Sequence, residues 1–255
     1  MKIIIASSHE EVGRVAARLV ARRITMHRRH GRAVGLRLAT GGTPRPLYRE
    51  LVRLHREEAF AFGDVWFSSL DAYVGPKRGD LGSYPDELWE QLLRHVDCDP
   101  EKVRLTDAPT DSPDELLAII HRLEQELDEP ERHEIALFGI GHDTHVAFIC
   151  PGSRRGRLRL RGFGIEQLSE LTREKNARFF GCMKELVPPQ ALTILGGSLL
   201  GMDLNILMAA GEEKADAVWN MLHQPVCEEY PATILREAPR TVVILDRAAA
   251  RRIAR

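Results

Sequence analysis

Three hydrophobic segments of this sequence each end in glycines and polar residues, and this repeated pattern limits the folds open to the chain. The segments are 34–44 (VGLRLATGGTP), 65–75 (VWFSSLDAYVG) and 137–152 (LFGIGHDTHVAFICPG). A buried strand that stops at a glycine turn and then presents polar groups is typical of the carboxyl edge of a parallel sheet, where active-site loops gather. We therefore expect the three loops to meet over one pocket.

About seven hydrophobic segments alternate with helical patterns along the chain. Such alternation predicts an α/β fold, a doubly wound and mostly parallel sheet with helices on both faces, Rossmann-like in arrangement. No internal repeat or linker divides the sequence, so we expect one domain over 1–255. The first strand, KIIIA, is expected to be short and buried. The expected strands are 2–6, 34–39, 65–70, 134–139, 191–195, 205–211 and 241–246.

Helix boundaries are indicated by capping residues. Ser7 and Ser8 each precede a glutamate by three residues, which predicts a capping box before a first helix. The polar run 26–32 (MHRRHGR) then reads as a loop. Ser112, with Glu115 three residues later, is expected to cap a helix over 113–127. Gly196-Gly197-Ser198 reads as a second glycine turn.

An arginine-rich run, 153–162 (SRRGRLRLRG), alternates arginine with leucine in its second half. Arg157, Arg159 and Arg161 alternate with Leu158 and Leu160, which predicts a half-exposed strand with a solvated arginine face. A nucleic-acid surface would need interleaved aromatic residues and a larger positive charge.

Composition narrows the class of protein. An apolar fraction of 44% supports a real core, and a net charge of −1 gives no bulk attraction to nucleic acid or membrane. The start MKIIIA is too short for a signal peptide, and no window is long and apolar enough for a membrane span. Four scattered cysteines without a CxxC pair argue against a zinc site and a disulfide framework, so we expect a protein of the reducing cytoplasm.

The three loops carry candidate site residues. Gly41, Gly42 and Thr43 lie between a strand and a helix, where backbone N–H groups can bind a phosphate, although a plain turn is the alternative. Asp71 follows the third strand and is either a catalytic acid or a cap. Asp143 and His145 follow the fourth expected strand.

Lys214 is a further candidate outside the three loops. It lies in the first turn of an expected helix, where its charge opposes the helix dipole, and a bound anion would relieve this unfavourable arrangement.

With these residues in view, the chain resembles the glucosamine-6-phosphate deaminase family, which shares its fold with 6-phosphogluconolactonases. The matching segments, in order, are ATGGTP (39–44), LDAYVG (70–75), GIGHDTHVAF (139–148), NARFF (176–180) and GEEKADAV (211–218). The resemblance implies an enzyme that interconverts an aldose and a ketose and releases ammonia from an amino-sugar 6-phosphate. It implies a small-molecule sugar phosphate as partner and no metal or organic cofactor, and it leaves a homo-oligomer open.

The resemblance also implies residue roles. Asp71 matches the base that moves a proton between C1 and C2, and Asp143 and His145 match the aspartate and the ring-opening histidine. A carboxylate and a histidine suit these proton transfers near neutral pH. The phosphate is expected to contact the glycine turn, helped by two cations. The phosphate residues are Gly41, Gly42, Thr43, Arg178 and Lys214.

Four positions depart from the deaminase pattern. The Asn-Glu-Pro that follows the histidine motif is here Ile149-Cys150-Pro151, so a thiol replaces a glutamate. Ala72 replaces the second acid after Asp71, and Thr144 replaces a glycine. Two alternatives therefore stay open. One is a 6-phosphogluconolactonase-type hydrolase, and the other is a sugar-phosphate-binding regulator without catalysis.

Overall fold

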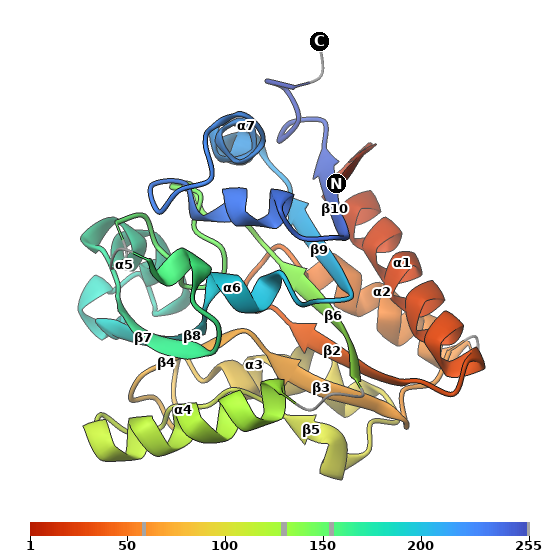
Figure 1. Ribbon diagram of the computed structural model, residues 1–255, viewed down its shortest axis with the longest axis horizontal. Helices are drawn as coiled ribbons and strands as arrows, with labels where there is room; N and C mark the ends of the chain where they lie inside the picture. The colour runs from red at the N-terminus through yellow and green to blue at the C-terminus, as the bar shows by residue number, and fades with distance from the viewer. Residues whose placement is uncertain (58–59, 129–131, 153–155, 254–255) are drawn as a thin grey trace.

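A computed structural model describes residues 1–57, 60–128, 132–152 and 156–253. Its centre is a sheet of seven strands in which every pairing is parallel (Figure 1). The doubly wound α/β prediction is confirmed. In spatial order the strands are β1 (Lys2–Ala6), β10 (Thr241–Asp246), β9 (Leu204–Ala209), β6 (Arg132–Phe138), β2 (Ala33–Leu38), β3 (Val65–Ser69) and β5 (Val103–Arg104).

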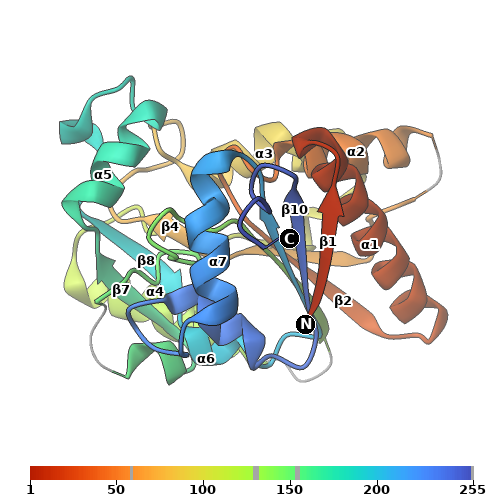
Figure 2. The ribbon, with the colours of Figure 1, turned by 90° about the horizontal axis from the view of Figure 1, so that it is seen from above.

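Helices cover both faces of this sheet. Figure 2 shows α1 (His9–Arg29) and α2 (Arg45–Arg56) on one side, and α6 (Gly196–Leu199) and α7 (Ala215–His223) on the other. The other α-helices are α3 (Tyr84–Gln91), α4 (Pro113–Leu127) and α5 (Glu170–Asn176). Short 3₁₀ turns are η1 (Leu93–His95), η2 (Pro100–Lys102), η3 (Arg157–Arg159), η4 (Ala177–Phe179), η5 (Lys184–Leu186), η6 (Glu212–Lys214) and η7 (Pro231–Arg236).

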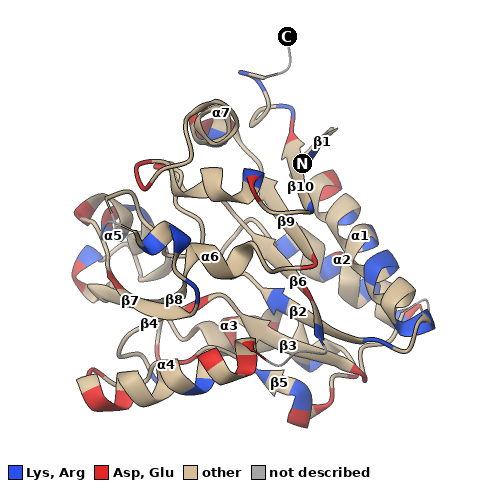
Figure 3. Cartoon of the chain, in the orientation of Figure 1, with Lys and Arg blue, Asp and Glu red and all other residues tan. Residues whose placement is uncertain are grey.

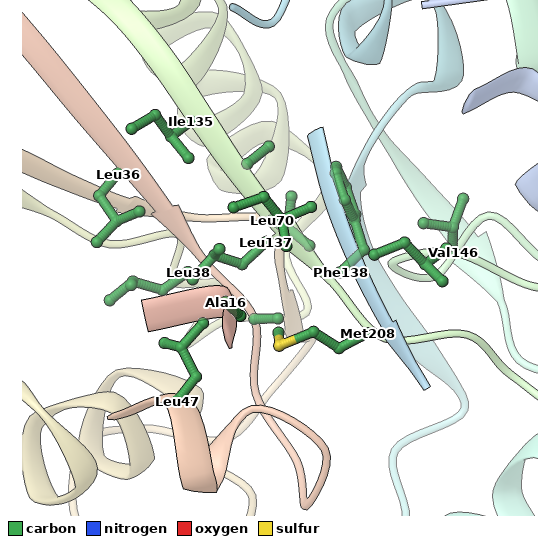
Figure 4. Close-up of a cluster of buried hydrophobic side chains, with 14 of the residues drawn as sticks. Ala16, Leu36, Leu38, Leu47, Leu70, Ile135, Leu137, Phe138, Val146 and Met208 are labelled. Carbon is green, nitrogen blue, oxygen red and sulfur yellow. The ribbon is translucent and has the colours of Figure 1, made fainter. Parts of the chain in front are cut away.

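The main hydrophobic core lies between the central strands and α1 and α2. Leu36 and Leu38 of β2 and Leu137 of β6 are fully buried, and they pack with Ala16 of α1 and Leu47 of α2 (Figure 4). Strands buried on both faces read as continuous apolar runs, which is why the sequence pattern located them well.

A second, three-stranded sheet lies beside the first, and the sequence did not predict it. Its order is β4 (Asp71–Tyr73), β8 (Gln190–Ile194) and β7 (Phe163–Gln167), with both pairings antiparallel. Asp71 therefore begins a strand of its own and does not lie in a loop at the edge of the parallel sheet. The segment expected as a strand over 191–195 is β8, and it belongs to this second sheet.

Three helix predictions were wrong. Helix α1 continues to Arg29 through the run expected as a loop at 26–32, because His27 is buried against the sheet and extends the apolar face of the helix. Gly196-Gly197-Ser198 forms the start of α6 instead of a turn. Ser8 caps α1 as expected, but Ser112 makes no side-chain capping bond to α4, which begins with Pro113.

Two strand predictions also need correction. Strand β1 is an edge strand paired with β10, and Ile3 and Ile5 are exposed because they point to the face opposite Ile4, which packs against the core. The described part of the arginine run forms the 3₁₀ turn η3 and no strand, since Gly156 turns the chain in the left-handed region and Leu158 is buried singly. Residues 153–155 of that run lie outside the described residues.

Charged residues are spread over the surface, with acidic positions along α4 and basic ones along α1 (Figure 3). In the described part of the chain, no helix combines the length and the apolar run needed to cross a membrane.

The order of the parallel strands reverses between β2 and β6. From β2 the chain proceeds outward to β3 and β5, and from β6 it proceeds outward in the other direction to β9 and β10. Ligands of open α/β sheets bind at the carboxyl ends of strands at such a switch point. The loops after β2 and β6 are the glycine turn 39–43 and the histidine loop 139–148, so the fold brings these two segments together.

Candidate active site

One cleft lies at this switch point, and all eight residues singled out from the sequence line it. We call it the active-site cleft. Its walls come from the loop after β2, the start of β4, the loop after β6, the α5–η4 segment and η6. The eight residues are Gly41, Gly42, Thr43, Asp71, Asp143, His145, Arg178 and Lys214. The geometry therefore brings them together, while the role of each stays a prediction.

Asp71 is a buried carboxylic acid that opens into the cleft. Its exposed fraction is 7%, and no described residue donates a hydrogen bond to its carboxylate or pairs with it. Burial, followed by the negative charge of Glu87, raises the pKa of Asp71 to about 7. A carboxylate with this pKa and no fixed partner can both accept and return a proton near neutral pH.

His145 is oriented by Asp143. Its Nδ1 lies 2.7 Å from Asp143 Oδ1, and its backbone N–H donates to the same oxygen at 3.2 Å. Burial alone would raise the pKa of Asp143, but the hydrogen bonds from His145 outweigh it, and the net pKa lies below its usual value. An ionised carboxylate only accepts, so Nδ1 carries a proton and Nε2 is the nitrogen that can exchange one.

The histidine loop is backbone-strained on both sides of His145. Thr144 has φ 70° and Ala147 has φ 53°, and both are non-glycine residues in the left-handed region. Close packing holds this shape, since a Cβ on Gly141 would come within 2.2 Å of the His145 ring. Strain of this kind persists where a fixed side-chain geometry over-determines the backbone, as it does at functional sites.

Two cations face the cleft without a carboxylate in salt-bridge range among the described residues. Arg178 stacks on Phe179, with 4.7 Å from its guanidinium carbon to the ring centroid, and is otherwise exposed. Lys214 is half-buried, and burial is the main reason why its pKa is lowered. The charge of Arg178 lowers this pKa further, whereas the charge of Glu213 acts in the opposite direction. Two like charges without a salt bridge favour an anionic ligand between them.

The glycine turn is arranged differently from the prediction in one respect. The backbone N–H of Gly41 donates to Glu87 Oε1 at 3.0 Å, so in this conformation it is not directed at a ligand. Gly41 instead supplies the turn, with φ 87°. The N–H groups that remain for a phosphate belong to Gly42 and Thr43, with the Thr43 hydroxyl beside them.

Sequence reasoning missed a chain of hydrogen-bonded residues, three of which line the cleft. Asn176 Nδ2 donates to the Tyr73 hydroxyl at 2.9 Å, Tyr73 bonds to Tyr84, and Tyr84 bonds to Thr40. Burial raises the pKa of Tyr73 to about 12, so its hydroxyl stays protonated. These bonds tie α5, β4, α3 and the glycine turn together. Nothing in the local sequence pattern signals them, because the partners are far apart in the chain.

Two further basic residues of the cleft were also missed. His142 and Lys175 line it near the two cations. Burial, followed by the charges of Lys214 and Lys175, lowers the pKa of His142. A histidine directly before Asp143, in the motif GIGHDTH, was a signal that could have identified His142 from the sequence.

Cys150 is not among the residues that line the cleft. It is 4% exposed and belongs to a second hydrophobic cluster with Tyr73, Phe148 and Phe180. Burial, followed by the nearby charge of Asp143, raises the pKa of the Cys150 thiol to about 12, and Thr172 hydrogen-bonds it. The thiol is therefore neutral at physiological pH and cannot supply the charge of a glutamate.

A second group of polar residues lies at the opposite, amino-terminal end of the sheet. His27 and His133 stack with ring centroids 4.1 Å apart. One ligand atom from each of these histidines and one from Asp203 lie within 4.8 Å of one another, close enough to hold a metal ion. Asp203 is already held by Arg23 at 2.6 and 2.8 Å and by Arg240 at 2.8 Å. Two guanidinium groups on one carboxylate disfavour a bound cation, so we interpret this group as an ion-pair network joining α1, β6 and β9.

Comparison with known proteins shows the family of this chain. The family model described as glucosamine-6-phosphate isomerases/6-phosphogluconolactonase matches residues 7–244. Glucosamine-6-phosphate deaminase 1 of Bacillus subtilis is 34% identical over 98% of both chains. Glucosamine-6-phosphate deaminase 2 of Giardia intestinalis is 37% identical over 94% of this chain and 88% of its own.

Solved structures show the same relationship. A monomeric glucosamine-6-phosphate deaminase superposes with a TM-score of 0.89 at 32% identity, over 98% of this chain and 99% of its own. The 6-phosphogluconolactonase of Trypanosoma brucei superposes with a TM-score of 0.78 at 19% identity, over 99% and 98%, and shares the fold. The chain therefore belongs to the family of glucosamine-6-phosphate isomerases and 6-phosphogluconolactonases.

Proposed function

We propose that this protein is a glucosamine-6-phosphate deaminase, which converts an amino-sugar 6-phosphate and water into a ketose 6-phosphate and ammonia. The observation that carries the proposal is the pairing of two features in one cleft. One is a carboxylate without a partner among the described residues, Asp71. The other is a pair of cations without a salt bridge there, Arg178 and Lys214.

The cations suit the phosphate of the substrate. A phosphate monoester is a dianion near neutral pH, and it would neutralise Arg178 and Lys214 together. The N–H groups of Gly42 and Thr43 precede α2, so the positive end of the helix dipole adds to the attraction. No metal or organic cofactor is needed for this binding mode.

His145 is assigned to ring opening. It would take the proton of the O1 hydroxyl and return a proton to the ring oxygen, which breaks the C1–O5 bond and leaves an aldehyde at C1. Asp143 fixes the tautomer through the 2.7 Å contact to Nδ1, so Nε2 performs both transfers.

Asp71 is assigned to the carbon acid step. It would remove the proton from C2 while the ammonium group at C2 gives one proton to O1, which forms a neutral enol-amine. The proton then returns to C1, which leaves a protonated imine at C2. Water adds to C2 and ammonia leaves, giving the ketone. A base with a pKa of about 7 can take and return this proton.

Ammonia release tests the proposal directly. Glucosamine 6-phosphate should give stoichiometric ammonia and fructose 6-phosphate, and Asp71→Asn should abolish both while sugar-phosphate binding persists. Hydrolysis of 6-phosphogluconolactone, with no ammonia from the amino sugar, would instead identify a lactonase.

A neutral Cys150 at the glutamate position favours one alternative, a sugar-phosphate-binding regulator. It removes a carboxylate from the neighbourhood of His145 and so weakens ring opening. Binding of glucosamine 6-phosphate in a calorimeter, with no product after prolonged incubation, is the result that would support the regulator.

A further inference from the structure

Tyr73 contacts the segment that carries Arg178 on both sides of that arginine. The Tyr73 hydroxyl accepts a hydrogen bond from Asn176 Nδ2 at 2.9 Å, and Asn176 lies two residues before Arg178. The Tyr73 ring meets the ring of Phe180, two residues after Arg178, edge to face with centroids 5.3 Å apart. Two contacts to one buried side chain therefore enclose η4, the 3₁₀ turn in which Arg178 lies.

The contact through Phe180 leaves this turn little room to move. Phe180 is buried, and a Cβ on Gly82 would come within 2.5 Å of its ring, so the ring packs directly on the backbone of Gly82. The backbone N–H of Phe180 donates to the Ala177 carbonyl at 2.8 Å, which closes the turn. Arg178 stacks on Phe179, whose side chain lines the cleft. The position of the guanidinium therefore follows the position of η4.

Tyr73 also belongs to the strand that begins with Asp71. Residues i and i+2 of a strand share one face, so Asp71 and Tyr73 lie on the same face of β4. Both are buried, but of the two only Asp71 lines the cleft. The Tyr73 ring also lies 5.2 Å from the ring of Phe148, the last residue of the histidine loop. One side chain thus connects the strand of the base, the histidine loop and the turn of the phosphate cation.

We infer that Tyr73 is a positioning residue that holds Arg178 at a fixed place relative to Asp71, through Asn176 on one side of the arginine and Phe180 on the other. The substrate carries its reacting carbon C2 and its phosphate at different places, so the two protein groups that meet them must keep a matching separation. The inference deepens the proposed deaminase function and rests on it for its kinetic readout.

A second route leads from the Tyr73 hydroxyl to the phosphate site. Tyr73 bonds to Tyr84, and Tyr84 bonds to Thr40 of the glycine turn. If this route carried the effect, loss of the hydroxyl would disturb the glycine turn and not Arg178. The variants must therefore separate the two routes.

Tyr73→Phe removes the hydroxyl and keeps the ring against Phe180. Glucitol 6-phosphate, which has no amino group to release, measures binding without turnover. Its Kd from calorimetry should rise about fivefold, which corresponds to roughly 1 kcal/mol for one lost hydrogen bond. The KM for glucosamine 6-phosphate should rise by a similar factor with kcat within about twofold, because the lost contact serves binding alone. Tyr230→Phe is the matched control, because it removes a hydroxyl outside the cleft, and it should match the wild type.

The double variant with Arg178→Ala decides between the two routes. If Tyr73 acts by placing Arg178, Tyr73→Phe should change the Kd by less than about 1.5-fold once Arg178 is absent, because the two changes are then not additive. A fivefold loss that persists in this background would show that the hydroxyl acts through Tyr84, and it would overturn the inference.

A measurement without ligand keeps this outcome apart from failure of the proposed function. In the resting protein, the backbone amides of residues 177–179 should have lower ¹⁵N heteronuclear NOE values in Tyr73→Phe than in the wild type, and unchanged values in Tyr230→Phe. If these values fall but the wild type releases no ammonia, the deaminase proposal fails and the positioning of the turn by Tyr73 stands. Unchanged values in a folded Tyr73→Phe would contradict the positioning role even if the wild type releases ammonia.

Discussion

The Nδ1 atom of His145 lies 2.7 Å from Oδ1 of Asp143, although only Thr144 separates the two residues in the chain. The contact exists because Thr144 adopts φ 70°, which folds the backbone so that both side chains occupy the same side of the loop. In a helix residues i and i+2 point to different sides, and in a strand they share a face but lie roughly 6.6 Å apart, so neither would bring the two side chains into contact. Strain in the loop and orientation of the imidazole are thus two aspects of one geometry.

Asp143→Asn should therefore lose activity with little loss of structure. The amide can still accept the backbone N–H of His145, but it no longer selects the tautomer with the proton on Nδ1. We expect kcat/KM to fall on the order of 10²-fold or more, as when a histidine loses its orienting carboxylate. Steady-state ammonia release measures this, and Asp86→Asn is the surface control. A loss of less than twofold would contradict the orienting role.

Asp71→Asn should stabilise the protein while inactivating it. Burial raises the folded pKa of Asp71 from the ordinary 3.8 to about 7, so the stability that its protonated form contributes is fully present below about pH 4 and is lost as pH rises through about 7. A pKa raised this far corresponds to about 4 kcal/mol, and we expect about half because the carboxyl faces the cleft. Urea unfolding at pH 6 and pH 8.5 should show a gain for Asn that is larger at pH 8.5.

The wild-type pH profile follows from the same group. The base must be ionised, so kcat/KM should rise with pH up to about 7 and then level off or fall as another group titrates. A profile with full activity at pH 5 would show that the pKa of Asp71 is not raised in the free protein.

Arg178→Ala should weaken binding of sugar phosphates. Its guanidinium group can contact two phosphate oxygens at once. Because Arg178 is exposed in the free protein, we expect its removal to cost only a moderate amount of binding free energy. We expect about 2 kcal/mol, roughly a thirtyfold rise in Kd. Arg178→Lys should recover part of it. Calorimetry with glucosamine 6-phosphate gives the values, and Arg161→Ala, which removes an exposed charge paired with Asp128, should change nothing.

Thr144→Gly should cost less stability than the same substitution at an unstrained position. A β-branched residue at φ 70° is strained, and the relief of this strain in glycine offsets the loss of the buried Thr144 side chain and the extra freedom in the unfolded chain. The free energy of unfolding should change by about 1 kcal/mol or less. Thr25→Gly, inside α1, is the control and should lose stability, because its backbone is helical. Denaturation midpoints compare the two, and equal losses at both positions would exclude strain at Thr144.

Cys150→Glu should trade stability for activity. The longer carboxylate would restore an anion near His145 and so favour the charged imidazole, which should increase turnover of closed-ring substrate. It would also place a charge at a site that is 4% exposed and close to Asp143, at a cost of about 2 kcal/mol or more. Cys150→Ser, neutral and similar in size, should leave turnover as it is. An unchanged rate in a folded Cys150→Glu would show that another group already performs this task.

The sequence by itself determined the parallel sheet and the three loops that carry Thr43, Asp71 and His145. Strands such as β2 and β6 are buried on both faces, so their apolar runs appear directly in the sequence, and each glycine turn marks a strand end. Because carboxyl ends of parallel strands share one edge, the sequence alone was enough to place Thr43, Asp71 and His145 together.

Only the tertiary structure decided the second sheet and the contacts made across the chain. Asp71 pairs with Thr193, which lies far away in the sequence, and the Glu87 bond to Gly41 joins helix α3 to the turn before α2. Such contacts depend on which surfaces the packed core brings together and leave no local periodicity. The burial that sets the pKa of Asp71 has the same origin, since desolvation is a property of the folded surroundings and not of the residue.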